Sequence, residues 1–222
     1  MDGKTAQQIV QEYTQWSAIK NDWANLAYYQ EANSLLQEPA KSENRVVFMG
    51  NSITEMWKVH VPTFFENESF INRGISGQTT PQMLIRFRQD VIQLQPRIVV
   101  ILAGTNDIAG NTGPTTNQMI LDNIISMIEM ANANNVKVIL CSVLPVNKYP
   151  WFPNLKPADR VISLNKSLES YAKKHSVQYV DYYSALVDKE KGLPKKYAPD
   201  GVHPNKLGYS IMEPLVLDAL NN

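Results

Sequence analysis

The sequence predicts a three-layer α/β/α sandwich in which a sheet of five parallel strands is covered by helices on both faces. Two observations support this prediction: short apolar runs alternate with stretches of helical periodicity, and the apolar runs are almost continuous. Continuous apolar strands are typical of parallel sheets buried on both sides, and their alternation with helices indicates right-handed βαβ crossovers. The length of 222 residues fits a single domain.

The first strand of this sheet is expected at Val46–Met49, where four apolar residues precede Gly50. Four more strands and four helices are expected after it. The strands are expected at 69–73, 97–103, 136–143 and 177–182, and the helices at 79–94, 117–134, 158–175 and 206–220.

Two further helices are expected before the sheet, and we expect this segment, residues 1–38, to pack on the body of the same domain. The second of them follows a cap at Asn21 and is ended by Pro39. The apolar stripes consist of Ile9, Tyr13, Trp16 and Ile19 in the first helix and of Trp23, Leu26, Leu35 and Leu36 in the second.

Charge and hydropathy exclude several classes of partner. Twenty-one basic and twenty-one acidic residues give no net charge, and no stretch is rich in lysine or arginine as a nucleic-acid surface would be. No apolar run approaches the roughly 20 residues of a membrane span, and the first residues lack the apolar core of a leader, so a soluble chain is expected. Because a leader can be removed, the compartment stays open between cytoplasm and export. Cys141, the single cysteine, is expected to be a buried, unreactive thiol.

Ser52 follows the first strand and stands where a helix is expected to begin. Open parallel sheets bind ligands just outside the carboxyl ends of their strands, and a helix N-terminus offers free N–H donors to a negative group. Ser52 is therefore a candidate nucleophile. The alternative is that its side chain only caps the helix.

A serine nucleophile needs a base, and the chain has three histidines. His203 lies in a turn-rich loop before the last helix, with Asp200 three residues earlier, so the carboxylate can reach the ring nitrogen that does not face the serine. A simple surface contact between the two is the alternative. His60 lies soon after the first helix, and His175, which stands between Lys174 and Ser176 at the polar end of another, is expected to be a surface residue.

Acyl transfer also needs hydrogen-bond donors for an oxyanion. The second strand ends at Gly74, whose backbone N–H can approach a substrate closely, and the third is followed by Asn106, whose side chain carries an amide donor. Taken singly, the glycine is better explained as a turn residue and the asparagine as a loop cap, but three neighbouring strand ends that supply a nucleophile and donors are hard to explain as independent turns. A proline-rich loop at 146–158, which contains Trp151 and Phe152, is either a substrate-contacting loop or a structural one.

The residues singled out above resemble the four sequence blocks of the SGNH hydrolases, also called the GDSL lipase and acylhydrolase family. The blocks are Gly50-Asn-Ser-Ile-Thr54, Gly74, Gly104-Thr-Asn-Asp107 and Asp200-Gly-Val-His203. The run that begins Ile-Asn-Arg-Gly74 is similar to the branch that includes the intracellular platelet-activating-factor acetylhydrolase subunits. Asn51 stands where the family usually has aspartate, and its amide is expected to keep the hydrogen bonds of the loop.

The resemblance implies both a strand order and a set of roles. The order is the flavodoxin-like 2-1-3-4-5. Ser52 would be the nucleophile, His203 the base and Asp200 the residue that orients the base. The oxyanion hole would consist of the backbone N–H groups of Ser52 and Gly74 and the side chain of Asn106.

The leading hypothesis is therefore a serine-dependent esterase that uses no metal and no organic cofactor and acts on a small-molecule ester. Neutral, polar loops suggest short acyl groups, such as acetyl on a sugar or small alcohol. A thioesterase or lysophospholipase would use the same residues. The alternative of a non-catalytic flavodoxin-like binding module gives Asp200 and His203 no functional role. A metal hydrolase is disfavoured because the three histidines are scattered along the chain. The oligomeric state is left open.

Overall fold

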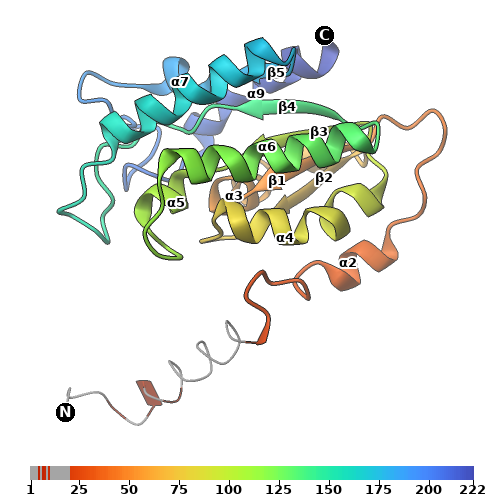
Figure 1. Cartoon of the computed structure of the whole chain (residues 1–222), viewed down its shortest axis with the longest axis horizontal. Helices are drawn as coiled ribbons and strands as arrows, with labels where there is room; N and C mark the ends of the chain where they lie inside the picture. Colours follow the sequence, from red (N-terminus) through yellow and green to blue (C-terminus); the bar gives the residue numbers. More distant parts are fainter. Residues whose placement is uncertain (1–4, 6, 9, 11–20) are drawn as a thin grey trace.

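The computed structural model describes residues 5, 7, 8, 10 and 21–222, and it contains one five-stranded parallel sheet in the order β2-β1-β3-β4-β5 (Figure 1). The predicted fold class and strand order are thus confirmed. The strands are β1 (Val46–Gly50), β2 (Phe70–Gly74), β3 (Ile98–Leu102), β4 (Lys137–Cys141) and β5 (Gln178–Val180).

The helices and 3₁₀ turns between and around the strands follow the predicted alternation, with ends displaced by a few residues at most for the four long helices. The α-helices are α2 (Gln30–Leu35), α3 (Ser52–His60), α4 (Thr80–Asp90), α5 (Thr105–Ala109), α6 (Asn117–Ala133), α7 (Ala158–Lys174), α8 (Tyr182–Leu186) and α9 (Lys206–Asn221), and the 3₁₀ turns are η1 (Pro62–Glu66) and η2 (Ile92–Leu94).

Alternate side chains of the strands enter two separate apolar cores, one on each face of the sheet. In β1, Val47 and Met49 pack with the buried faces of α4, α6 and α7, while Val46 and Phe48 pack with α3, α8 and α9. Both faces are therefore covered, which explains why the sequences of the central strands β1, β3 and β4 are almost continuously apolar.

The three central strands end together at one edge of the sheet. Gly50, the last residue of β1, is paired with Gly74 of β2 and with Leu102 of β3. The residues that follow these strands must therefore lie beside one another, at the carboxyl edge where parallel α/β sheets bind ligands.

The first of the two predicted N-terminal helices lies outside the described residues, and the prediction of the second is wrong over most of its length. Residues 22–29 are not helical and consist mostly of turns, and between residues 22 and 37 the helix is limited to the six residues of α2. The Asp22 carboxylate accepts the N–H groups of Leu26 and Ala27, and Asn25 adopts a left-handed φ of 52°, which interrupts a helix.

We call residues 22–37 the N-terminal strap. The strap is attached to the body mainly by polar contacts. Of the predicted apolar stripe, Leu36 packs against the core, whereas Trp23, Leu26 and Leu35 are exposed. Side-chain amides on or just before α4 donate to carbonyls of the strap: Gln78 to Ala24, Gln82 to Trp23 and Gln89 to Leu26.

Two smaller expectations concern Cys141 and membrane-spanning helices. Cys141 is buried in β4, and burial raises the pKa of its thiol to about 12, as expected for an unreactive cysteine. Within the described ranges, no helix combines the length and the apolar character that crossing a membrane requires.

Candidate active site

Ser52 is the first residue of α3, directly after β1, and it is nearly buried. The chain can turn there because residue 50 is glycine: a Cβ on Gly50 would lie 2.0 Å from Thr54 Oγ1 and 2.9 Å from the carbonyl oxygen of Leu102. Asn51 is the N-cap, and its Oδ1 accepts the N–H of Ile53 at 3.0 Å. Its amide thus makes the capping hydrogen bond without a carboxylate.

The structure brings Ser52, His203 and Asp200 into one hydrogen-bonded line. Ser52 Oγ lies 3.0 Å from His203 Nε2, and His203 Nδ1 lies 2.6 Å from Asp200 Oδ2. The other carboxylate oxygen of Asp200 accepts the backbone N–H groups of Val202 and His203 at 2.9 and 2.8 Å. This is the arrangement in which an imidazole can take a proton from a serine hydroxyl.

Asp200 is suited to balance a positive charge on His203. Partial burial by itself raises the pKa of the Asp200 carboxyl, but the hydrogen bonds from the His203 ring and from the backbone outweigh burial and hold this pKa below its usual value. The carboxylate is therefore ionised at neutral pH and can stabilise an imidazolium.

The loop that carries His203 is fixed to the nucleophile helix through α9. The hydroxyl of Tyr209, a buried residue of α9, donates to the carbonyl of Ile53 at 2.7 Å, and its ring stacks on Trp57 of α3 at 5.1 Å. The two halves of the site, which are 151 residues apart in the chain, are thus held together by a direct contact between their helices.

Asn106 lies in the first turn of α5, almost fully buried, at the edge that carries Ser52. Its Nδ2 donates one hydrogen to the carbonyl of Gln78 at 2.9 Å. A carboxamide has two N–H donors, so the second hydrogen remains available for a ligand.

Gly74 does not fit the role predicted for it. Its N–H donates to Asn72 Oδ1 at 2.9 Å, and its carbonyl accepts the hydroxyl of Tyr29. A Cβ at this position would lie 2.2 Å from the backbone nitrogen of Glu55, so the glycine allows β2 to pack closely against α3. The donor that was expected to face an oxyanion is already engaged.

Gly77, three residues later, carries a backbone donor that the sequence reasoning did not single out. It adopts a left-handed φ of 79°, and its N–H has no acceptor among the residues that the structure describes. Its loop is held between Ser52 and Asn106, because Ile75 N–H donates to the carbonyl of Gly50 and Asn106 donates to that of Gln78. The available signal was its place in the loop after the strand, whereas Gly74 is the last residue of the strand.

Arg86 of α4, which the sequence reasoning also did not single out, holds this edge of the sheet in place. Its guanidinium is fully buried and donates to the carbonyls of Gly50 and Arg73 and to the Gln78 side chain, while Asp90 neutralises its charge at 3.0 Å. One side chain thus ties together the ends of β1 and β2 and the Gly77 loop. A cationic side chain within the buried stripe of α4 was the available signal.

Asp107, the neighbour of Asn106, is a buried carboxyl that joins α5 to the start of α4. It accepts the backbone N–H of Thr80 at 3.0 Å and the Thr80 hydroxyl at 2.6 Å. Burial is the main influence and raises the pKa of Asp107 to about 6, although the Thr80 hydrogen bonds oppose it. The carboxyl helps to fix the helix that presents Asn106.

The loop at 146–158 reaches the site and is anchored by Tyr149. The buried hydroxyl of Tyr149 donates to the carbonyl of Thr105 at 2.8 Å, and the exposed Trp151 and Phe152 follow it. The Trp151 ring lies 6.0 Å from the His203 ring between centroids. This position is consistent with a substrate-contacting loop, which stays a prediction.

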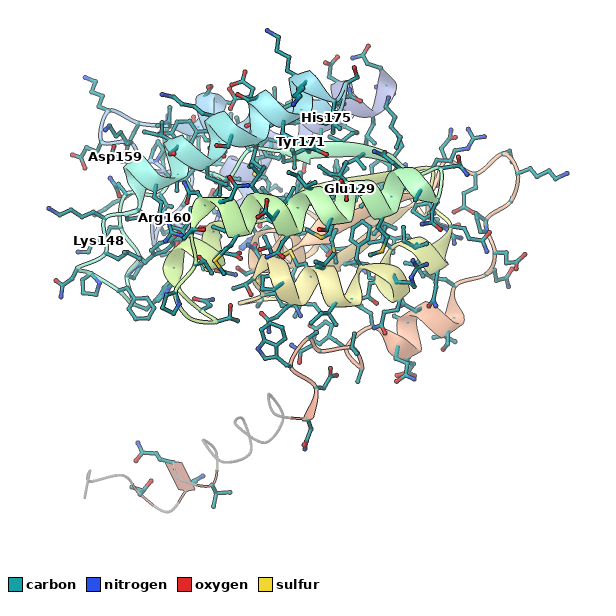
Figure 2. The ribbon with its side chains drawn as sticks, in the orientation of Figure 1. Glu129, Lys148, Asp159, Arg160, Tyr171 and His175 are labelled. Atoms are coloured by element: carbon teal, nitrogen blue, oxygen red, sulfur yellow. The ribbon has the colours of Figure 1, made fainter. Side chains whose placement is uncertain are left out.

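The other two histidines lie elsewhere. His175 follows the end of α7, stacked on Tyr171 at 4.2 Å, and Figure 2 shows both at the opposite end of α7 from Arg160. His60 ends α3 and packs against Tyr209. His203 is therefore the histidine that the structure brings to Ser52.

Comparison with known proteins points to one family and to several solved structures. The model of the GDSL-like Lipase/Acylhydrolase family matches residues 48–211. A protein from Bacteroides fragilis provisionally described as an acylhydrolase is 50% identical, with a TM-score of 0.88 over 90% of this chain and 97% of that chain. A GDSL-like lipase from Bacteroides thetaiotaomicron is 49% identical, with a TM-score of 0.87 over 89% and 98%.

Among curated proteins, an acetylxylan esterase from Xylanibacter ruminicola is 24% identical over 227 residues, covering 85% of this chain and 46% of the esterase. The chain spans between about a third and about half of the length of the curated relatives that it matches.

Proposed function

Because the chain belongs to the GDSL-like lipase/acylhydrolase family and is a hydrolase acting on ester bonds, we propose that Ser52, His203 and Asp200 form its catalytic triad. We further propose that its substrates are short-chain esters, above all acetyl esters, of a sugar or small alcohol. The observation that carries the triad is the line of contacts at 3.0 Å from Ser52 Oγ to His203 Nε2 and at 2.6 Å from His203 Nδ1 to Asp200.

The reaction proceeds in two steps through an acyl-enzyme. Ser52 Oγ attacks the ester carbonyl carbon while His203 Nε2 takes the hydroxyl proton, and the same nitrogen then gives that proton to the departing alcohol oxygen. In the second step His203 takes a proton from water, the resulting hydroxide attacks the acyl carbon, and Ser52 leaves with the proton returned to its oxygen. Asp200 stabilises the imidazolium in both steps.

We assign the oxyanion hole to the backbone N–H groups of Ser52 and Gly77 and to the second amide hydrogen of Asn106. Ser52 N–H belongs to the first turn of α3, where backbone donors have no partner within the helix. Gly77 takes the place of Gly74 in this assignment, because the Gly74 N–H is engaged by Asn72.

Two observations support the short-chain, sugar-linked substrate. The loops around Ser52 are rich in neutral polar residues, and the acetylxylan esterase relative is an enzyme whose name gives an acetylated sugar polymer as its substrate. The test is a panel of p-nitrophenyl esters from acetate to dodecanoate, with acetylated sugars and an acyl thioester, using wild type and Ser52→Ala. We expect the highest kcat/KM on acetate and loss of turnover in Ser52→Ala. A preference for dodecanoate or for the thioester would replace this proposal by a lysophospholipase or a thioesterase.

A further inference from the structure

A pocket of about 460 Å³ lies beside the Gly77 loop, between the N-terminal strap and the loops that follow β3 and β4. Its volume is within the range of about 300–1,000 Å³ that is usual for small-molecule sites. Its lining includes Trp23 and Asn25 of the strap, Gly77, Gln82, Asn111 and Phe152. We call it the strap pocket.

The strap pocket begins where the proposed oxyanion hole ends. Gly77 and Gln78 line it, and the carbonyl of Gln78 is the acceptor for Asn106. Asn111 donates from Nδ2 to the carbonyl of Gly77 at 2.9 Å and from its backbone to the carbonyl of Asn106 at 3.0 Å. On the far side, Phe152 follows Trp151, the neighbour of His203. The pocket is thus bordered by the loop that carries the proposed Gly77 donor and by the loop that brings Trp151 to His203.

The lining combines aromatic rings with carboxamides and has no charged side chain. Trp23 and Phe152 are 39% and 49% exposed, so both rings are available to a ligand. Asn25 makes no side-chain hydrogen bond to any residue of the described part of the chain, and the Oδ1 atom of Asn111 is not used by its contact with Gly77. Carboxamides both donate and accept, as hydroxyl groups require.

We propose that the strap pocket binds a neutral saccharide ring of the acylated substrate, an inference that rests on the proposed esterase function. A sugar ring presents C–H groups on its faces, which pack on aromatic rings, and hydroxyls on its rim, which pair with carboxamides. A phosphate or carboxylate would find no cation in the lining, and burying an unpaired charge is costly. An acyl chain would leave the carboxamides without partners.

The pocket is held in its binding shape by contacts that do not involve a ligand. Gln82 is part of the capping box of α4 and donates to the carbonyl of Trp23 at 2.6 Å, and Gln78 donates to the carbonyl of Ala24 at 2.7 Å. Phe152 N–H donates to the carbonyl of Tyr149, whose hydroxyl is anchored in the core. A site that is ordered before binding spends less free energy on ordering when the ligand arrives.

The kinetic test compares substrates with and without a saccharide. Trp23→Ala, Phe152→Ala and the double variant are assayed on p-nitrophenyl acetate and on acetylated xylo-, cello- and manno-oligosaccharides. We expect the double variant to raise KM for the best oligosaccharide at least tenfold more than it raises KM for p-nitrophenyl acetate. Trp23→Phe, which keeps an aromatic ring, should show only a small part of the KM increase of Trp23→Ala. Met119→Ala, which removes an exposed apolar side chain on α6, is the control and should change neither value.

A binding test separates this inference from the triad. Calorimetry with deacetylated oligosaccharides on Ser52→Ala protein needs no turnover, and we expect binding that the added Trp23→Ala and Phe152→Ala changes weaken at least tenfold. Equal affinity with and without these changes would overturn the inference. The same variants are also assayed on long-chain p-nitrophenyl esters, and a KM effect confined to those esters would overturn it as well, because the pocket would then be an acyl site. Failure of the esterase proposal is distinct, since wild type would then leave p-nitrophenyl acetate intact.

Discussion

Replacing Asn106 by alanine separates the catalytic from the structural use of one carboxamide. One hydrogen of Nδ2 is bonded to the carbonyl of Gln78, and we propose that the other faces the oxyanion. Loss of a preorganised oxyanion donor lowers kcat by about 10²–10³, or roughly 2.7–4 kcal/mol. Loss of the bond to a buried carbonyl lowers the free energy of unfolding by about 1–3 kcal/mol. Both effects are expected in Asn106→Ala.

The assay measures kcat and KM on p-nitrophenyl acetate and the thermal midpoint on the same sample. KM should change little, because the ground-state carbonyl carries much less negative charge than the tetrahedral intermediate. The matched control is Tyr29→Phe, which removes a hydrogen bond to the carbonyl of Gly74 at the end of β2 without removing an oxyanion donor. We expect the control to lower the midpoint while kcat stays within about threefold.

The outcome that refutes the oxyanion role is a lowered midpoint in Asn106→Ala with kcat within about threefold of wild type. Asn106 would then act only as the support of the Gln78 loop. A fall in kcat that Tyr29→Phe reproduces would also refute it, because loosening of the loop alone would explain both variants.

Three further predictions address other parts of the site. Ser52→Ala should lower kcat by about 10⁴ or more with an unchanged circular dichroism spectrum, and a fluorophosphonate should label Ser52 in wild type; an adduct on another serine would move the nucleophile. Arg86→Met should lower the free energy of unfolding by about 3–5 kcal/mol in denaturant titrations, because the buried Asp90 loses its partner; a loss below 1 kcal/mol would contradict the buried pair. Burial raises the pKa of Asp107 to about 6, so the folded state holds this proton more tightly than the unfolded state does. The free energy of unfolding should therefore fall by up to about 3 kcal/mol as pH rises from 4 to 6. Asp107→Asn should remove that fall, and identical pH profiles of stability for wild type and Asp107→Asn would contradict the raised pKa.

Periodicity and strand ends were enough to predict the frame of the site. The apolar run at Val46–Met49 and its successors locate the strands, and a parallel sheet necessarily brings their carboxyl ends to one edge. Ser52 and Asn106 follow two adjacent strands, so their proximity could be predicted without side-chain contacts. His203 could be assigned because its loop also supplies Asp200.

The errors arose where local side-chain hydrogen bonds to the backbone, which leave no periodic pattern in the sequence, decide the structure. The apolar spacing of Trp23 and Leu26 is compatible with a helix, but the Asp22 carboxylate and the left-handed Asn25 interrupt it. Gly74 and Gly77 both follow the same apolar run, and what distinguishes them is the partner of each N–H. That partner, the Asn72 side chain in the case of Gly74, is not encoded in any local period.

The proposed site consists of two parts that are held by different contacts. The nucleophile and the oxyanion donors belong to the ends of β1, β2 and β3 and to the loops that Arg86 and Asn106 join, so their relative positions follow from the sheet register and one buried network. The base comes from a loop before α9 and is aligned with Ser52 through the contact of Tyr209 with Ile53. The two networks meet at α3, because Ser52 supplies both the nucleophilic oxygen and a proposed oxyanion donor. Changes away from Ser52 should alter either the proton-transfer step or the oxyanion step. Their effects on kcat should be additive in free energy only when the 3.0 Å contact between Ser52 and His203 is kept.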